Sequence, residues 1–332
     1  MNSYRLSLIL FAAAAFAHPP QDGKEALALN QRGLEAASRH DYAESEKDYR
    51  QSSGIYRALG AQFEAHLSIV LFNLAESMCG QGKWREADGI FEESLALSRI
   101  ALGPKHIRTA ADLNALGNVS MMLGEMSRAE EQLAEALAIE RENYPADLQL
   151  GSTLAALSAL RRRAGKLDEA LPLAEEALTV TLKAEGKEGP ESAMMYRNVA
   201  QIHWAACRTD RALPLYRKAR AILERLGATS DSRYAALLSQ EGLALMDDGK
   251  LGLAESGMKR AIELLSRAAA DELELAVAQN NLGLLRMRQK KYREADELLS
   301  KALSTEQLYN SQDMAQISRT QDALAKVRSA LR

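Results

Sequence analysis

The sequence has few of the residues that cross-link or interrupt a helical chain. Among its 332 residues there are two cysteines and seven prolines, and aromatic residues make up 5%. Cys79 and Cys207 lie too far apart in the repeat register described below to form a disulfide, so we expect two free thiols in the core. Alanine, leucine, glutamate and arginine are abundant, and these residues lose least on entering a helix. The composition therefore predicts an all-α chain.

The sequence also lacks the groupings that catalysis or metal binding requires. Glycines occur singly rather than in a phosphate-binding loop, and no His-Glu-x-x-His pair is present. The five histidines have no second histidine or cysteine at ligand spacing. The formal net charge of −3 disfavours general nucleic-acid binding. We therefore expect a protein that is not an enzyme, with no catalytic residues, no metal, no cofactor and no nucleic acid.

One long apolar run occurs, and it lies at the N-terminus. Leu6 to Phe16 follows a short segment that carries Arg5, and Ala15-Phe16-Ala17 has the small-x-small pattern of a cleavage site. These roughly 11 apolar residues fall short of the ~20 that a membrane-spanning helix needs. The pattern predicts a signal peptide at 1–17 and a short linker at 18–23. The cleaved protein would be periplasmic or secreted, with no stable membrane span.

The rest of the chain repeats with a period of about 42 residues. Three series of positions hold only Gly, Ala or Ser in every repeat. The first series is Ser45, Ala87, Ala129, Ala170, Ala212, Ala254 and Ala295. The second series is Gly33, Ala75, Gly117, Ser158, Ala200, Gly242 and Gly283. The third series is Ser52, Ser94, Ala136, Ala177, Ala219, Ala261 and Ala302.

Small residues at fixed spacing indicate helices that approach closely, with larger residues filling the gaps beside them. The large residues recur four positions after the first series: Tyr49, Phe91, Leu133, Ala174, Tyr216, Met258 and Leu299. Each repeat also has a turn position, usually glycine: His40, Gly82, Gly124, Gly165, Cys207, Gly249 and Lys290. The pattern predicts two antiparallel helices per repeat.

This pattern resembles the tetratricopeptide repeat, and its period resembles the longer kinesin-light-chain type. Leu71-Phe72-Asn73-Leu74-Ala75 and Leu102-Gly103-Pro104-Lys105-His106 are similar to segments of that type. The resemblance implies a right-handed α-solenoid of about seven helix-turn-helix repeats over residues 24–310. We expect residues 311–332 to form a capping helix, with Met314, Ile317, Val327 and Leu331 on the core face. Arg32, Arg161 and Glu241 depart from the apolar pattern.

The resemblance further implies that the first helix of each repeat lines a concave groove. Asn, Gln and Arg recur at the positions that would face this groove. Lys and Glu would be the less costly choice for a solvated helix face, and Asn is a poor helix former. The predicted peptide-groove residues are Asn73, Asn114, Asn118, Arg162, Arg163, Arg197, Asn198, Gln201, Gln240, Asn280, Asn281 and Arg288. Trp204, Met246 and Met287 could add apolar anchors. The alternative is that these side chains simply face water, or, for the apolar three, pack in the core.

Amide side chains can pair with the backbone of any extended peptide, and arginine binds carboxylates with two hydrogen bonds. We therefore expect a non-catalytic adaptor that binds a protein or peptide segment, acidic near Arg162, Arg163 and Arg197. The alternative function is a structural subunit of an envelope assembly, which would self-associate or stack through its convex face or its ends. The sequence predicts neither the partner's identity nor the oligomeric state.

Overall fold

The computed structural model describes residues 23–230, 232–268, 272–309 and 314–332. The signal-peptide prediction, and most of the predicted linker, lie outside these residues. The described chain forms two compact units that divide between Pro145 and Ala146. The first unit contains α1 (Lys24–Ser38), α2 (Tyr42–Leu59), the short 3₁₀ helix η3 (Ala61–Phe63), α3 (Glu64–Gly80), α4 (Trp84–Ala101), α5 (Ile107–Met122) and α6 (Met126–Asn143).

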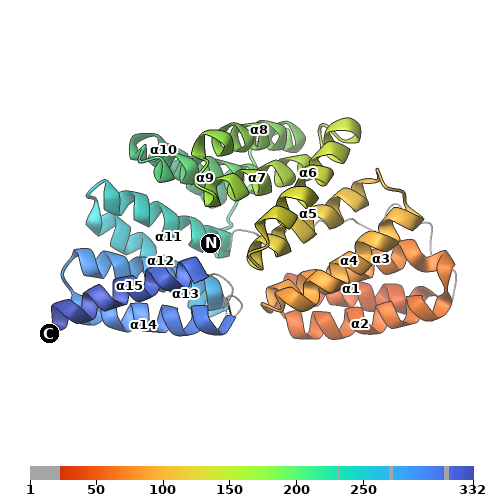
Figure 1. Ribbon diagram of the computed structural model, residues 1–332, viewed down its shortest axis with the longest axis horizontal. Helices are drawn as coiled ribbons and strands as arrows, with labels where there is room; N and C mark the ends of the chain where they lie inside the picture. Colours follow the sequence, from red (N-terminus) through yellow and green to blue (C-terminus); the bar gives the residue numbers. More distant parts are fainter. Residues whose placement is uncertain (1–22, 231, 269–271, 310–313) are drawn as a thin grey trace. The chain divides into compact units, whose positions relative to one another are not determined.

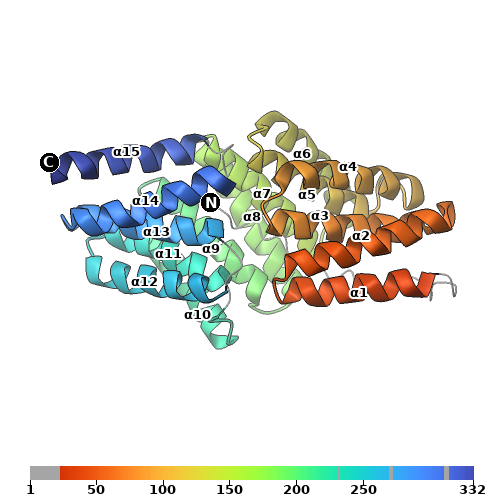
Figure 2. The same cartoon turned by 90° about the horizontal axis from the view of Figure 1, so that it is seen from below.

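The second unit continues the same pattern with nine α-helices. They are α7 (Leu148–Arg163), α8 (Leu167–Glu185), α9 (Pro190–Ala205), α10 (Thr209–Arg225), α11 (Ser232–Asp247), α12 (Leu251–Ala268), α13 (Glu272–Arg288), α14 (Tyr292–Tyr309) and α15 (Met314–Leu331). Within each unit the helices follow one another as antiparallel pairs (Figures 1 and 2). The all-α fold of stacked helix hairpins is thus confirmed, with three hairpins in the first unit and four hairpins plus α15 in the second.

The small-residue series explain why the hairpins pack so closely. Every member of the first series, from Ser45 to Ala295, is fully buried. The large residues lie directly beneath the second series: the Tyr49 ring packs against Gly33, and Leu133 packs against Gly117. Serines within the series keep their hydroxyls paired, since Ser52 donates to the Ala26 carbonyl at 2.7 Å and Ser94 donates to the Ser68 carbonyl at 2.8 Å. The predicted interleaving of small and large residues is therefore confirmed.

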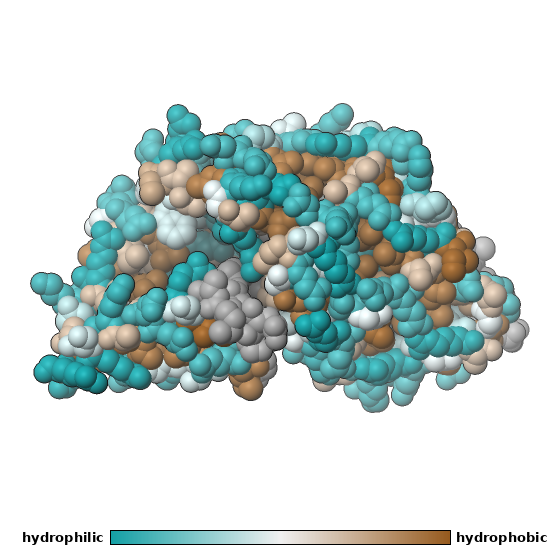
Figure 3. All heavy atoms as spheres, viewed as in Figure 1, coloured by the Kyte–Doolittle hydropathy of each residue, from teal (hydrophilic) through white to brown (hydrophobic). Residues whose placement is uncertain are grey.

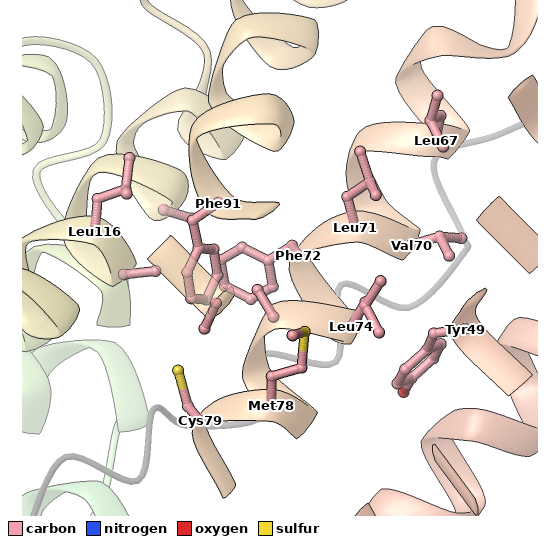
Figure 4. Close-up of a cluster of buried hydrophobic side chains, with 14 of the residues drawn as sticks. Tyr49, Leu67, Val70, Leu71, Phe72, Leu74, Met78, Cys79, Phe91 and Leu116 are labelled. Atoms are coloured by element: carbon pink, nitrogen blue, oxygen red, sulfur yellow. The ribbon is translucent and has the colours of Figure 1, made fainter. Parts of the chain in front are cut away.

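Aromatic residues complete the core of the first unit. Figure 4 shows Phe72 of α3 beside Phe91 of α4, and their ring centroids are 5.2 Å apart in an edge-on arrangement. Met78 and Leu74 lie on the same helix, with Tyr49 of α2 facing them. Edge-to-face aromatic pairs contribute about 1 kcal/mol beyond the area that they bury. This cluster joins the first two hairpins into one core.

The three residues that depart from the apolar pattern all have charged partners. The Arg32 Nε donates to Asp48 at 3.2 Å. Buried Glu241 pairs with the Arg220 Nε at 3.1 Å, and Arg161 pairs with Glu169 at 3.1 Å. Each pair joins a first helix to a second helix, so the packing is preserved although the apolar residue is missing.

The capping helix α15 covers the last hairpin as expected. Ile317, Leu324 and Val327 are buried, and the last two belong to the same cluster as Leu299 of α14. Leu331 is 45% exposed, so the prediction that it joins this core face was wrong. The opposite face of α15 exposes Ser318, Arg319, Asp322 and Lys326. A polar outer face of this kind lets a solenoid end in water.

The turn within each hairpin requires a left-handed backbone. All seven turn positions have positive φ, including three without glycine: His40 at 64°, Cys207 at 56° and Lys290 at 61°. The Cys207 side chain is exposed, so the prediction that both cysteines are core thiols was wrong for this one; Cys79 is buried. Cys207 is exposed because it lies in the turn and not in the helix interface.

We predict that Cys207→Gly stabilises the protein. A non-glycine residue in the left-handed region costs about 1 kcal/mol, and the Cys207 side chain is exposed. The free energy of unfolding, measured by urea titration, should therefore rise by about 1 kcal/mol. Gly124→Ala is the control. It places a residue with a Cβ atom at a φ of 80°, in the left-handed region, and should lower the stability by a similar amount. A Cys207→Gly protein no more stable than its parent would show that the turn carries no strain.

Candidate functional site

The first helices of neighbouring hairpins lie close to one another. In the first unit α1 contacts α3, and in the second unit α7 contacts α9, α9 contacts α11, α11 contacts α13, and α13 contacts α15. Among the described residues no two second helices make comparable contact, and within each unit a second helix packs instead on the first helix that follows it. Closer spacing of the first helices places them on the inner side of each curved stack. We define the inner face of each unit as the exposed surface of its first helices.

In the first unit the three predicted groove asparagines differ in exposure. Asn73 is partly exposed, and its Nδ2 donates to the Asn30 Oδ1 on the neighbouring first helix at 3.1 Å. Asn114 is 0% exposed and Asn118 is 4% exposed, and the Asn118 Nδ2 donates to the Asn114 Oδ1 at 2.9 Å. A ligand could therefore meet Asn73 directly, whereas the two asparagines of α5 lie beneath the surface.

The amides of the second unit also bond to neighbouring helices. The Asn281 Nδ2 donates to the Ser239 Oγ at 2.9 Å, and the Asn280 Nδ2 donates to the Thr320 Oγ1. Both asparagines are buried. The Gln201 Nε2 of α9 donates to the Gln240 Oε1 of α11, and this pair remains partly exposed. These amides thus link consecutive first helices, a structural role that the sequence did not reveal.

The predicted arginines separate into a buried and an exposed group. Arg197 is 2% exposed and lies near the Tyr216 ring of α10, so it belongs to the helix interface. Arg162 and Arg163, at the C-terminal end of α7, are partly exposed, as is Asn198 of α9. Arg288, at the end of α13, is exposed. The binding roles of all twelve residues stay predictions, but accessibility favours the exposed ones.

One short chain of contacts crosses the inner face of the second unit. The Trp204 Nε1 of α9 donates to the Asp247 Oδ2 of α11 at 2.8 Å. The Arg288 Nη1 of α13 donates to the other oxygen, Asp247 Oδ1, at 3.3 Å. The Asp247 and Arg288 side chains remain 45% and 46% exposed. We define Trp204, Asp247 and Arg288 as the inner triad.

Sequence reasoning identified Trp204 and Arg288 but missed Asp247. A signal was present: the corresponding position of each repeat reads Ser38, Gly80, Met122, Arg163, Ala205, Asp247 and Arg288, so Asp247 is the only acid in the series. Asp247 is also the last residue of α11, where the helix dipole disfavours a negative charge. Two donors from neighbouring helices offset that cost.

A second unpredicted feature is a charged cluster inside the first unit. Arg108, 4% exposed, stacks on the Phe72 ring with its guanidinium carbon 4.2 Å from the centroid, and donates to the Ser68 carbonyl at 3.0 Å. The fully buried Asp112 carboxylate accepts from Ser98 at 2.6 Å, and its other oxygen lies 2.8 Å from the Ser94 Oγ. The contacts named here join residues of α3, α4 and α5, so we interpret this cluster as holding the three helices together.

Nearby, Glu76 of α3 has an unusual environment. Its Oε1 atom is inaccessible and accepts no hydrogen bond from the residues described. Burial raises the pKa of Glu76 from 4.5 to about 8, although the Arg108 charge opposes the shift. The carboxyl is therefore mostly protonated at neutral pH.

The structure offers no group of three or more His, Cys, Asp and Glu side chains that could hold a metal ion, within the residues that it describes. In the same residues, none of the helices combines the length and apolar character needed to cross a bilayer.

Comparison with known proteins agrees with this architecture. The sequence model of the tetratricopeptide repeat matches residues 66–142 and 149–225, so each match spans two consecutive hairpins. The chain is 26% identical to the Arabidopsis thaliana protein KINESIN LIGHT CHAIN-RELATED 1 over 228 residues. This alignment includes 65% of the chain but only 37% of that relative's length.

Solved structures show the same fold. The crystal structure of BtubC (BKLC) from P. vanneervenii superposes with a TM-score of 0.57 at 20% identity, covering 68% of this chain and 91% of that one. The Rap conjugation gene regulator of the plasmid pLS20, solved in complex with the Phr* peptide, gives a TM-score of 0.64 at 12% identity, covering 93% and 95%. Residues 66–142 and 149–225 are thus tetratricopeptide repeats, and the other described hairpins share their fold. The predicted resemblance to the kinesin-light-chain type is confirmed.

Proposed function

We propose that this protein is a non-catalytic adaptor whose second unit binds an extended or helical peptide segment along the inner face of α7, α9, α11 and α13. The observation that carries the proposal is the row of accessible polar side chains on these consecutive helices. The row contains Arg162, Arg163, Asn198, Gln201, Gln240 and Arg288.

The chemistry of the row suits a peptide main chain. An exposed amide offers a donor and an acceptor together, so Asn198, Gln201 and Gln240 can pair with peptide N–H and C=O groups of any sequence. Arg162 and Arg163 lie side by side at the end of α7 and add positive charge. An acidic segment of the ligand is therefore favoured at α7.

The comparisons support the peptide-binding class. The Rap regulator, which shares the fold at a TM-score of 0.64, was solved in complex with the Phr* peptide. That finding concerns the Rap protein, and its 12% identity to this chain transfers no residue roles. It shows that a stack of such hairpins can hold a peptide.

The assembly alternative has less support. Stacking through the ends would require apolar end faces, but α1 exposes Lys24, Gln31 and Glu35, and α15 exposes polar residues as well. On the second helices of the first unit, arginines already pair with the next hairpin: Arg57 with Glu93 at 2.8 Å and Arg99 with Glu135 at 2.6 Å. These faces are therefore typical of a solvated surface.

Export to the periplasm or the medium is part of the proposal and depends on residues 1–17 alone. The apolar run Leu6 to Phe16 and the small residues Ala15 and Ala17 support cleavage there. The binding partner should accordingly be a protein or peptide segment that is displayed outside the cytoplasm.

Peptide selection tests the proposed site. A displayed library of 12-residue peptides would be panned against the full chain, and affinities of selected peptides measured by fluorescence polarisation. We expect the selected peptides to be acidic. We also expect Arg162→Glu/Arg163→Glu to lower their affinity at least about tenfold, because the charge of the site is reversed.

The matched control reverses two arginines on the outer surface of the same unit. Arg211 and Arg217 of α10 are exposed, and hydrophilic residues cover much of the visible surface of this region (Figure 3). Arg211→Glu/Arg217→Glu changes the net charge by the same amount and should leave affinity within about twofold. Equal losses in both variants would refute the inner-face assignment.

A further inference from the structure

We propose that Asp247 is an internal carboxylate that determines where an acidic ligand can bind on the inner face. This inference rests on the proposed function and refines its specificity. By occupying the donors of Trp204 and Arg288, Asp247 closes the α9–α13 part of the face to ligand carboxylates. Acidic ligand residues are thereby confined to Arg162 and Arg163 at α7.

The geometry supports this role because the triad already forms a carboxylate site. The indole N–H of Trp204 binds one Asp247 oxygen at 2.8 Å, and the guanidinium of Arg288 binds the other at 3.3 Å. Two donors from two different helices thus converge on a single carboxylate. A ligand carboxylate that bound the Trp204 N–H would have to displace Asp247, and one that approached the other Arg288 donors would meet the negative charge of Asp247.

The site is also accessible. Asp247 and Arg288 are nearly half exposed, and Trp204 is partly exposed. An ion pair of this exposure contributes little to folding, in the range of about 0–1 kcal/mol. Removing it should therefore change ligand binding without unfolding the chain.

The charge arrangement gives the row a direction. Arg162 and Arg163 place two arginines at α7, whereas Arg288 at α13 lies beside the negative charge of Asp247. Without Asp247 the arginine at α13 would also attract an acidic ligand residue. Asp247 therefore makes the two ends of the row different and favours one orientation of an acidic ligand.

Asp247→Asn in the full chain tests the proposal directly. Asparagine keeps the size of the side chain and one acceptor but removes the charge, which frees the Arg288 guanidinium. The probe is an N-acetylated hexaglutamate peptide at low ionic strength, where surface charges are least screened. We expect its affinity to rise about fivefold or more, and Asp247→Asn/Arg288→Gln to return it to the parent level.

Asp248→Asn provides the matched control. Asp248 is the adjacent residue, and its carboxylate pairs with Lys250 at 2.7 Å in the turn instead of joining the triad. This substitution removes the same charge and should change hexaglutamate affinity less than twofold. An equal gain in Asp247→Asn and Asp248→Asn, or no gain in Asp247→Asn, would overturn the proposal.

A different result would contradict the proposed function while leaving the Asp247 proposal intact. If Arg162→Glu/Arg163→Glu bound hexaglutamate as tightly as the parent, the acidic preference at α7 would be wrong. The gain from Asp247→Asn, and its loss on removing Arg288, would still support the internal carboxylate.

Discussion

Gly33→Ala should lower the free energy of unfolding by about 2 kcal/mol, even though alanine is the better helix former. A Cβ atom at residue 33 would lie 2.5 Å from the Tyr49 Cε1, closer than real Cβ contacts occur. The Tyr49 ring is fully buried and belongs to the same core cluster as residues of α3, so moving it aside would disturb their packing. Urea titration of the full chain measures the change.

Gly54→Ala is the control for this prediction. Gly54 lies in the middle of α2, and a Cβ atom there would meet nothing within 4 Å. The substitution should therefore stabilise the protein by about 0.5–1 kcal/mol through helix propensity alone. If Gly33→Ala were as stable as Gly54→Ala, close packing at the small-residue series would not be what sets the repeat register.

Glu76→Gln should remove a large pH dependence of stability. Because the folded-state pKa of Glu76 is about 8 and its ordinary value is 4.5, the folded protein holds this proton more tightly than the unfolded chain. The contribution to stability is therefore fully present below pH 4.5 and is lost as the pH rises towards 8. The parent should lose roughly 1 kcal/mol per pH unit across this window from Glu76 alone.

Glutamine keeps the shape of the side chain but cannot ionise, so the variant should lose much less stability between pH 5 and pH 8. The measurement is the urea midpoint of parent and variant at each pH. Glu93→Gln serves as a control because Glu93 lies on the exposed surface of α4, where its side chain is 41% exposed. Parallel curves for parent and Glu76→Gln would contradict the assigned pKa.

The sequence predicted the fold well because its signal is periodic. Ala87, Ala129 and Ala170 recur at the spacing of a stacked helical repeat, and each is fully buried at its expected interface. The turn positions were predictable for the same reason, since glycine marks a left-handed residue. Cys207 was misplaced because cysteine is usually buried, whereas the turn exposes it.

The candidate site was only partly predictable, because a sequence gives the face of a helix but not the partners across it. Asn114, Asn118 and Asn281 lie on the predicted helices, but neighbouring residues bury them and bind their amides. Asp247 was overlooked because its role depends on Trp204 and Arg288, 43 and 41 residues away. Contacts between repeats of this kind appear only when the register and the side-chain directions are both known.

The most direct test of the central claim is the indole ¹⁵N–¹H spectrum of the full chain, which has two tryptophans. Trp204 lies on the inner face of the second unit, whereas Trp84 begins α4 in the first unit and has an inaccessible Nε1. A Trp84→Phe variant assigns the two signals. Saturation with a selected acidic peptide should shift the Trp204 signal and leave that of Trp84 unchanged. A peptide that saturates the chain without shifting the Trp204 signal would contradict binding on the inner face.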